Sequence, residues 1–303
     1  MLPRNLQHNF IILIGILSLC FITPINAAKF SKQDSINFKQ IELAAGFANV
    51  VYQAETNITE FTRLNNYTVN SLHTIPESQI AYFIATNEPT KTQVISIRGT
   101  SNVENSIIDI SLKFVTDENS GLRLHQGFSF AAKQLYAELK PLLKKDYEIN
   151  ITGHSLGGAV ALILGMYLDL DRYNIGQITT FGQPKVSNIS GAKQFKHLTV
   201  IRVVTPLDLV PLLPLFDPMD INNLDIYWHS GKEVLLLPGT QYSILEGVNS
   251  MLRATGFTQT VPSVENLENH QMAYYIEQLY AKRNASEQVK YEHNFNIFNL
   301  FKP

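Results

Sequence analysis

Apolar and polar residues alternate along the chain in two patterns, one typical of β-strands and one typical of α-helices. Short runs rich in β-branched residues predict strands, and they cover residues 80–86, 92–97, 148–152, 178–181 and 198–204. Longer segments with apolar residues at helical spacing predict helices, and they cover residues 31–52, 129–145, 159–168, 241–254 and 271–282. Strands and helices that alternate in this way predict an α/β fold with a central, mostly parallel sheet flanked by helices.

Some stretches have weaker patterns. Residues 54–78 are polar and irregular, without a clear element. The apolar runs 226–229 and 234–237 flank Ser230-Gly231-Lys232, which predicts a β-hairpin. From about residue 283 onward the chain is polar, and we expect a C-terminal tail.

The first 27 residues have a pattern of their own. Arg4 precedes the mostly apolar run 10–22, which is short for a bilayer span, and small residues follow up to Ala27. This order is typical of a secretory signal peptide. We therefore expect cleavage after Ala27 and a secreted or periplasmic protein with no stable membrane span; an uncleaved anchor is the alternative. The mature chain, residues 28–303, is long enough to form a single α/β domain.

Composition narrows the range of partners. The chain has 303 residues, of which 45% are hydrophobic and 17% charged, and its formal net charge is −2 with no long run of either sign. Neither nucleic acid nor an anionic membrane surface is therefore indicated as an electrostatic partner. The single cysteine, Cys20, lies in the expected signal peptide, so the mature chain should have no disulfide and no cysteine nucleophile.

The strongest local motif is Gly153-His154-Ser155-Leu156-Gly157, between the predicted strand 148–152 and the predicted helix 159–168. This sequence fits a G-x-S-x-G nucleophile elbow, in which the serine sits at a strained turn between a strand and a helix. The flanking glycines leave room for the turn, because side chains there would collide with the strand or the helix. Ser155 is therefore a candidate nucleophile.

A serine nucleophile needs a base, and the base needs an acid that orients it. Asp208 follows the predicted strand 198–204, at the strand end where such folds place their sites, and we favour it as the acid. We favour His270, in a polar loop just before the helix 271–282, as the base. The competing candidates are side chains expected in turns, at a strand end or in the tail, namely Asp169, Asp171, Asp217, Asp220, His229 and His293.

The reaction also needs donors for a developing oxyanion. One candidate is the backbone N–H of Leu156, the residue after the nucleophile. A second is Thr100, which follows the predicted strand 92–97 and Arg98-Gly99 and offers both an N–H and a hydroxyl.

Taken together, these residues resemble the class 3, or fungal-type, lipases of the α/β-hydrolase fold. The resemblance extends from about residue 38 to 280 and implies Ser155 as nucleophile, Asp208 as acid, His270 as base and Thr100 as oxyanion donor. It also implies a lid from about residue 101 to 115, in which this chain has Ser106 where many members carry Trp; Asn269 likewise replaces the usual Asp before the histidine. The motifs that carry the resemblance are 94–100, 125–128, 151–158, 180–186, 202–211 and His270.

The expected function is that of a secreted serine carboxylester hydrolase acting on lipid esters, at a lipid–water interface, without metal or cofactor. Within the family, a triacylglycerol lipase, a phospholipase A1 and a short-chain or aromatic esterase remain open. An acyltransferase and a non-catalytic secreted binding protein are the candidates from different functional classes. The oligomeric state is not readable from the sequence.

Overall fold

The computed structural model describes residues 36–99, 113–214, 225–255 and 263–291. The chain divides into two units, residues 1–37 and Phe38–Pro303. All helices and strands described below belong to the second unit. The expected signal peptide, residues 1–27, lies outside the described residues.

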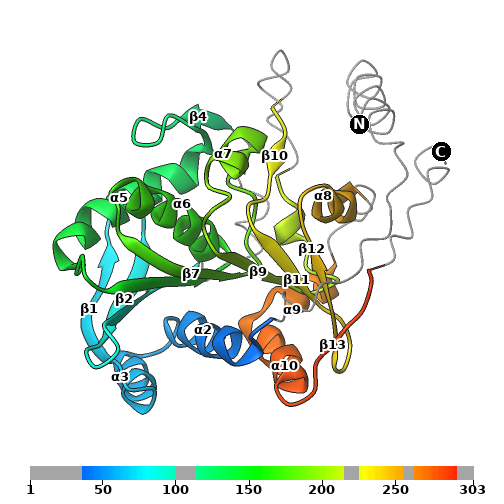
Figure 1. Cartoon of the computed structure of the whole chain (residues 1–303), viewed down its shortest axis with the longest axis horizontal. Coiled ribbons are helices and arrows are strands. Elements are labelled where there is room, and N and C mark those ends of the chain that lie inside the picture. The colour runs from blue at the N-terminus through cyan, green and yellow to red at the C-terminus, as the bar shows by residue number, and fades with distance from the viewer. Residues whose placement is uncertain (1–35, 100–112, 215–224, 256–262, 292–303) are drawn as a thin grey trace. The chain divides into compact units, whose positions relative to one another are not determined.

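The second unit is organised around one large sheet (Figure 1). Its central strands run parallel, while antiparallel neighbours extend it on both sides. In spatial order the described strands are β1 (Thr68–Ile75), β2 (Ile80–Asn87), β3 (Thr92–Ile97), β6 (Glu148–His154), β7 (Asn174–Phe181), β9 (Val200–Val204), β11 (Lys232–Leu236), β12 (Gln241–Leu245) and β13 (Glu287–Gln288). The predicted α/β fold with a mostly parallel sheet is confirmed.

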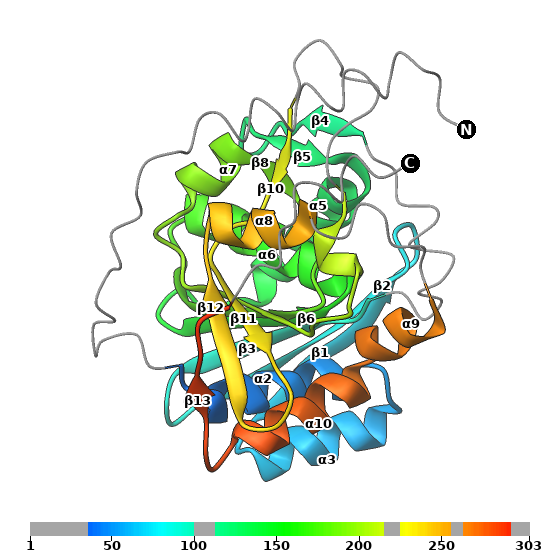
Figure 2. The same cartoon turned by 90° about the vertical axis from the view of Figure 1, so that its right-hand side faces the viewer.

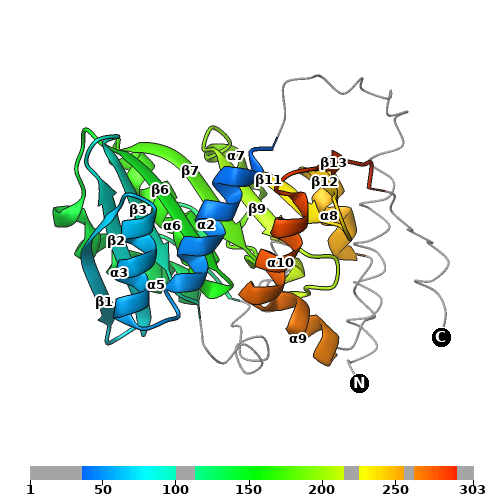
Figure 3. The same ribbon diagram turned by 90° about the horizontal axis from the view of Figure 1, so that it is seen from below.

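Helices cover both faces of this sheet (Figures 1 and 3). One face carries α5 (Gln126–Leu139), which the short 3₁₀ turn η1 (Lys140–Leu142) extends, and α6 (Leu156–Leu170). The opposite face carries the other layer, which consists of α2 (Phe38–Val50), α3 (Glu55–Leu64) and α10 (Met272–Lys282). Helix α6 is buried from Gly157 to Leu168, as its apolar composition predicts.

A small second sheet lies on the α5–α6 side of the large one (Figure 2). Its strands, in spatial order, are β10 (Tyr227–Trp228), β8 (Ser187–Asn188), β5 (Arg123–His125) and β4 (Phe114–Thr116). The remaining described elements are α7 (Ile189–Gln194), the 3₁₀ turn η2 (Val210–Leu212), α8 (Val248–Thr255) and α9 (Val264–His270).

The predicted hairpin around Ser230-Gly231-Lys232 is wrong. Strand β10 pairs with β8 in the small sheet, whereas β11 pairs with β9 and β12 in the large one. Gly231 has φ +72°, and a Cβ there would lie 2.4 Å from the carbonyl oxygen of Val200. The turn signal is therefore real, but the turn sends the chain from one sheet to the other.

The element assignments for 54–78 and 241–254 are also corrected. The first contains α3 and β1, in which only Ile58, Thr62 and Ile75 are buried, so its apolar signal is weak. In the second, Gln241–Leu245 forms β12, because it pairs with β11, and only α8 is helical. Tertiary pairing there overrides local preference.

A buried ionic cluster connects β9, β11 and α8. Glu233 accepts hydrogen bonds from Arg202, Arg253 and Ser250, and all four side chains are buried. The two arginines hold the pKa of Glu233 below its ordinary value despite its burial. The carboxylate is therefore paired, as a charge in a protein interior must be.

Candidate active site

Ser155 lies at the turn between β6 and α6, with φ +57° and ψ −129°. This left-handed backbone is strained for a residue with a side chain. A Cβ at Gly153 would lie 2.4 Å from the carbonyl oxygen of Gly157, and one at Gly157 would lie 2.3 Å from that of Ile97. The elbow can form only because both positions are glycine.

Asp208 and His270 are in direct contact. Nδ1 of His270 donates to Oδ2 of Asp208 over 2.8 Å, and the side chains are almost completely buried. Because Nδ1 carries the proton in this bond, the lone pair of the neutral ring is on Nε2. That nitrogen has no hydrogen-bond partner among the residues the structure describes, so it is available to accept a proton.

The carboxylate of Asp208 has two further donors. The backbone N–H of Val210 donates to Oδ1 over 2.9 Å, and the hydroxyl of Tyr275 in α10 donates to Oδ2 over 2.6 Å. Burial and the nearby Asp208 hold the pKa of Tyr275 well above its ordinary value, so its hydroxyl stays a donor. Sequence reasoning missed Tyr275, because a tyrosine on an amphipathic helix has the pattern of a core residue.

His270 is the last residue of a helix, α9, and not part of a loop as predicted. Ser263 and Asn266 form a capping box at the start of this helix. Two side-chain bonds then attach the helix to the segment around Asp208: Asn266 Nδ2 donates to Leu207 O over 2.8 Å, and Thr205 Oγ1 donates to Asn269 O over 3.0 Å. The segments that carry Asp208 and His270 are thus fixed to each other.

Ser155 is adjacent to this pair. Its backbone N–H donates to the carbonyl of Phe181 over 2.8 Å, and at the next residue, Gly182, a Cβ would lie 2.8 Å from Asp208 Oδ2 and from His270 Nδ1. Within the described part of the chain, Ser155 Oγ and His270 Nε2 are not hydrogen-bonded to each other. Catalytic hydrogen bonds are commonly long before substrate is bound.

Of the two candidate oxyanion donors, only Leu156 lies in the part of the chain that the structure describes. Leu156 is the first residue of α6, where a backbone N–H has no carbonyl partner within the helix. Thr100 lies outside the described residues, as does the expected lid except for residues 113–115. Gly99, immediately before Thr100, passes beside the elbow, since a Cβ on it would lie 3.1 Å from Ser155 Cβ.

The competing acids and bases that the structure describes are engaged elsewhere. Asp169 pairs with His197 and Asp171 with Lys140, at 2.9 Å and 2.7 Å. Nε2 of His229 contacts the carbonyl of Pro211 at 2.6 Å. Three further candidates lie outside the described residues, namely Asp217, Asp220 and His293.

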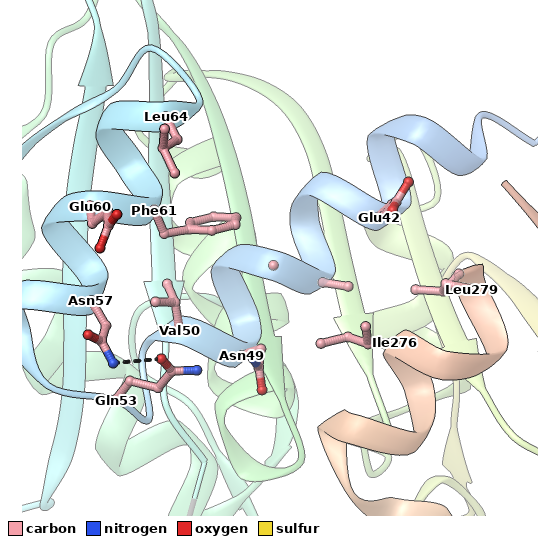
Figure 4. A pocket seen from close by; sticks show the side chains of 12 residues that line it. Glu42, Asn49, Val50, Gln53, Asn57, Glu60, Phe61, Leu64, Ile276 and Leu279 are labelled. Atoms are coloured by element: carbon pink, nitrogen blue, oxygen red, sulfur yellow. Dashed lines mark hydrogen bonds between the residues drawn. The ribbon is translucent and has the colours of Figure 1, made fainter.

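A pocket of about 480 Å³ lies between α2, α3 and α10 (Figure 4). Phe61 and Leu64 line it from α3, and Ile276 and Leu279 line it from α10. None of Ser155, Asp208 or His270 is among its lining residues. The pocket is therefore separate from the candidate active site.

Two kinds of feature are missing from the part of the chain that the structure describes. No three His, Cys, Asp or Glu side chains gather in these residues in a way that could hold a metal ion. None of the described helices has both the length and the apolar character that crossing a membrane requires.

Solved structures similar to this chain are lipases with the α/β-hydrolase fold. Lipase II from Rhizopus niveus matches with a TM-score of 0.62 at 23% identity, covering 77% of this chain and 92% of that one. A nonglycosylated lipase from Yarrowia lipolytica matches with a TM-score of 0.64 at 21% identity and the same coverage. The fold of this chain is thus that of the α/β-hydrolases.

Comparisons by sequence relate part of the chain to known lipases. The model described as lipase (class 3) matches residues 94–217. A secreted mono- and diacylglycerol lipase from Fusarium solani is 34% identical over 45% of this chain and 43% of its own length. A lipase from Rhizopus niveus is 30% identical over 52% of this chain and 42% of its own length. Residues 94–217 are thus similar to class 3 lipases, and the chain spans less than half the length of these curated relatives.

The family match includes Ser155 and Asp208 but ends before His270. The assignment of His270 therefore depends on its contact with Asp208.

Proposed function

We propose that this protein is a serine carboxylester hydrolase that acts on lipid esters through Ser155, His270 and Asp208. The observation that carries the proposal is the buried Asp208–His270 pair beside a serine on a strained elbow, with Nε2 of His270 unpartnered in the described residues. The names of similar proteins, among them a mono- and diacylglycerol lipase and a phospholipase A1 from Arabidopsis thaliana, support lipid esters as the substrate class.

In the proposed mechanism, Oγ of Ser155 attacks the ester carbonyl carbon while Nε2 of His270 takes its proton. Asp208 accepts the Nδ1–H bond and stabilises the imidazolium that forms. The N–H groups of Leu156 and Thr100 bind the oxyanion. The tetrahedral intermediate then expels the alkoxide, which takes the proton from Nε2 and leaves an acyl-enzyme on Ser155. Water, activated by His270, releases the acid.

Among the substrate classes, we place an acylglycerol lipase first, a phospholipase A1 second and a short-chain or aromatic esterase third. We also propose export after cleavage at Ala27, a single domain over residues 28–303 and action at a lipid–water interface. N-terminal sequencing of protein recovered outside the producing cells tests the cleavage site.

The function is tested by hydrolysis of p-nitrophenyl esters, with acyl chains from acetyl to palmitoyl, by residues 28–303. Ser155→Ala should lose roughly 10⁴-fold or more of the activity. Ser190→Ala, at an exposed serine in α7, is the matched control and should keep full activity. Diethyl p-nitrophenyl phosphate should label the unmodified protein but not Ser155→Ala.

The outcomes separate the candidate functions. Activity that persists on long chains and on emulsified triacylglycerol supports the lipase, whereas activity confined to short chains favours the esterase. Release of acid from the sn-1 position of phosphatidylcholine favours the phospholipase A1. Ester transfer to an added alcohol in preference to water favours an acyltransferase. A folded protein with neither turnover nor labelling refutes the proposal in favour of a binding protein.

A further inference from the structure

His154, the residue before Ser155 in the elbow motif, is part of a series of buried and partly buried hydrogen bonds. Nε2 of His154 contacts the carbonyl oxygen of His270 at 2.6 Å, and Nδ1 contacts the hydroxyl of Tyr52 at 3.0 Å. The same hydroxyl accepts the backbone N–H of Gly99 over 3.0 Å. These bonds therefore link four stretches of the chain, around Tyr52, Gly99, His154 and His270.

In these hydrogen bonds, the acceptors determine which atom carries each hydrogen. A carbonyl oxygen can only accept, so Nε2 of His154 carries the hydrogen and Nδ1 has the lone pair. Tyr52 must then donate to Nδ1, and its oxygen remains free to accept from Gly99. Burial and the nearby His270 lower the pKa of His154 to about 3. Burial raises the pKa of Tyr52 to about 12. Both side chains stay neutral at neutral pH, and the direction of every bond is fixed.

One end of the chain of bonds holds the segment of the candidate base. His270 is the last residue of α9, where backbone carbonyls lack a partner within the helix. At the start of α10, the backbone N–H groups of Tyr274 and Tyr275 donate to the carbonyl of Gln271 and not to that of His270. His154 thus supplies the donor for the carbonyl of His270 and fixes its backbone relative to Ser155, the next residue along the chain.

The other end holds the segment that leads to Thr100. A Cβ on Gly99 would lie 2.5 Å from the carbonyl oxygen of His154 and 2.7 Å from the hydroxyl of Tyr52. Gly99 is therefore in close contact with both residues. Any movement of Tyr52 would be transmitted to the end of β3 as well as to His154.

We propose that Tyr52 and His154 are positioning residues, which set the spacing between Ser155, the backbone of His270 and the segment that enters Thr100. This inference depends on the proposed function. Neither side chain needs to touch substrate; both act through the groups that they hold. A purely packing role would not require these two polar groups, the buried ring of His154 and the partly buried hydroxyl of Tyr52, because their removal from water has to be offset by hydrogen bonds.

The test compares Tyr52→Phe, His154→Leu, His154→Gln and the double variant Tyr52→Phe/His154→Leu. Tyr173→Phe is the matched control, because it removes a hydroxyl that donates to the carbonyl of Lys140 at 3.4 Å, away from the site. For each variant, kcat and KM are measured on p-nitrophenyl butyrate, together with the rate of labelling by diethyl p-nitrophenyl phosphate and the midpoint of thermal unfolding.

We expect Tyr52→Phe to lower kcat about tenfold and His154→Leu about 10²-fold, with KM little changed, since a misplacement near 1 Å costs about 10²-fold. The labelling rate should fall in parallel. His154→Gln should recover part of the loss, because its amide can donate to the carbonyl of His270. The double variant should match His154→Leu, since both changes break one chain of bonds.

The proposal is overturned if Tyr52→Phe and His154→Leu are folded and retain the kcat of the unmodified protein. It is also overturned if the losses appear in KM alone, if the Tyr173→Phe control loses as much, or if the two changes multiply in the double variant. Failure of the proposed function is a separate result, because then the unmodified protein neither hydrolyses the ester nor becomes labelled.

Discussion

Gly182 is the position where a single added carbon should affect the Asp208–His270 pair most directly. It follows β7, has φ +57° and donates its N–H to the carbonyl of Val203 over 3.1 Å. A Cβ there would lie 2.8 Å from Asp208 Oδ2 and from both Nδ1 and Cε1 of His270. We therefore expect Gly182→Ala to impair catalysis through the acid and the base.

The size of the effect follows from the geometry. Ordinary carbon contacts begin near 3.4 Å, so the pair must move by about 3.4 − 2.8 = 0.6 Å. Since a 1 Å misplacement costs about 10²-fold, kcat should fall by about 10- to 10²-fold, or about 1.4 to 2.7 kcal/mol in the activation free energy. The left-handed backbone adds about 1 to 2 kcal/mol of lost stability.

Gly239→Ala is the matched control. Gly239 has φ +66°, but a Cβ there would have no heavy atom within 4 Å. Both variants should therefore lose about 1 to 2 kcal/mol of stability, a fall of about 2 to 8 °C in the unfolding midpoint, but only Gly182→Ala should lose activity. The assay is kcat on p-nitrophenyl butyrate together with thermal unfolding followed by circular dichroism. Equal kcat values for the two variants would refute the reasoning.

Three further predictions concern buried polar groups. Tyr275→Phe removes a donor from Asp208, and we expect kcat to fall about tenfold with the fold retained; an unchanged kcat would contradict the role of this hydroxyl. Glu233→Gln leaves two buried arginines without their carboxylate, and urea titration should give a free energy of unfolding about 3 to 5 kcal/mol lower; a loss below about 1 kcal/mol would mean that the cluster contributes little. Stability should decline from pH 7 to pH 5, because the unfolded chain binds a proton at His154 below about pH 6.5 whereas the folded one does so only near its lowered pKa of about 3. His154→Gln should reduce that decline by about 2 kcal/mol, and an identical decline in both proteins would argue against a neutral, buried His154.

The parts of the fold that could be predicted are those whose causes are local in sequence. The elbow is an example, because β6, the turn at Ser155 and α6 are consecutive and their composition reflects that geometry. The parallel strands β3, β6, β7 and β9 likewise contain short runs rich in β-branched residues. By contrast, β12 depends on pairing with β11, and no pattern within its own residues distinguishes it from a helix start.

The candidate site divides in the same way. The order of the serine, the acid and the histidine along the chain selected residues that the structure brings together, although their catalytic roles stay predictions. The segment that was expected to be a loop before His270 is a helix. Its start is marked by the capping box of Ser263 and Asn266, and it has no apolar stripe from which a helix could be predicted. Tyr52 and Tyr275 could not be found, since only the contacts of their hydroxyls distinguish them from core residues.

The packing of α2 against α10 has a consequence for the timing of synthesis. The hydroxyl groups that reach the site come from Tyr52, just after α2, and from Tyr275 in α10, so 275 − 52 = 223 residues must be added between them. At ribosomal rates this takes roughly 10 to 45 seconds. His270 lies just before α10, so a nascent chain that ends before α9 lacks both the candidate base and Tyr275, and the proposed hydrolase stays inactive during almost all of its synthesis.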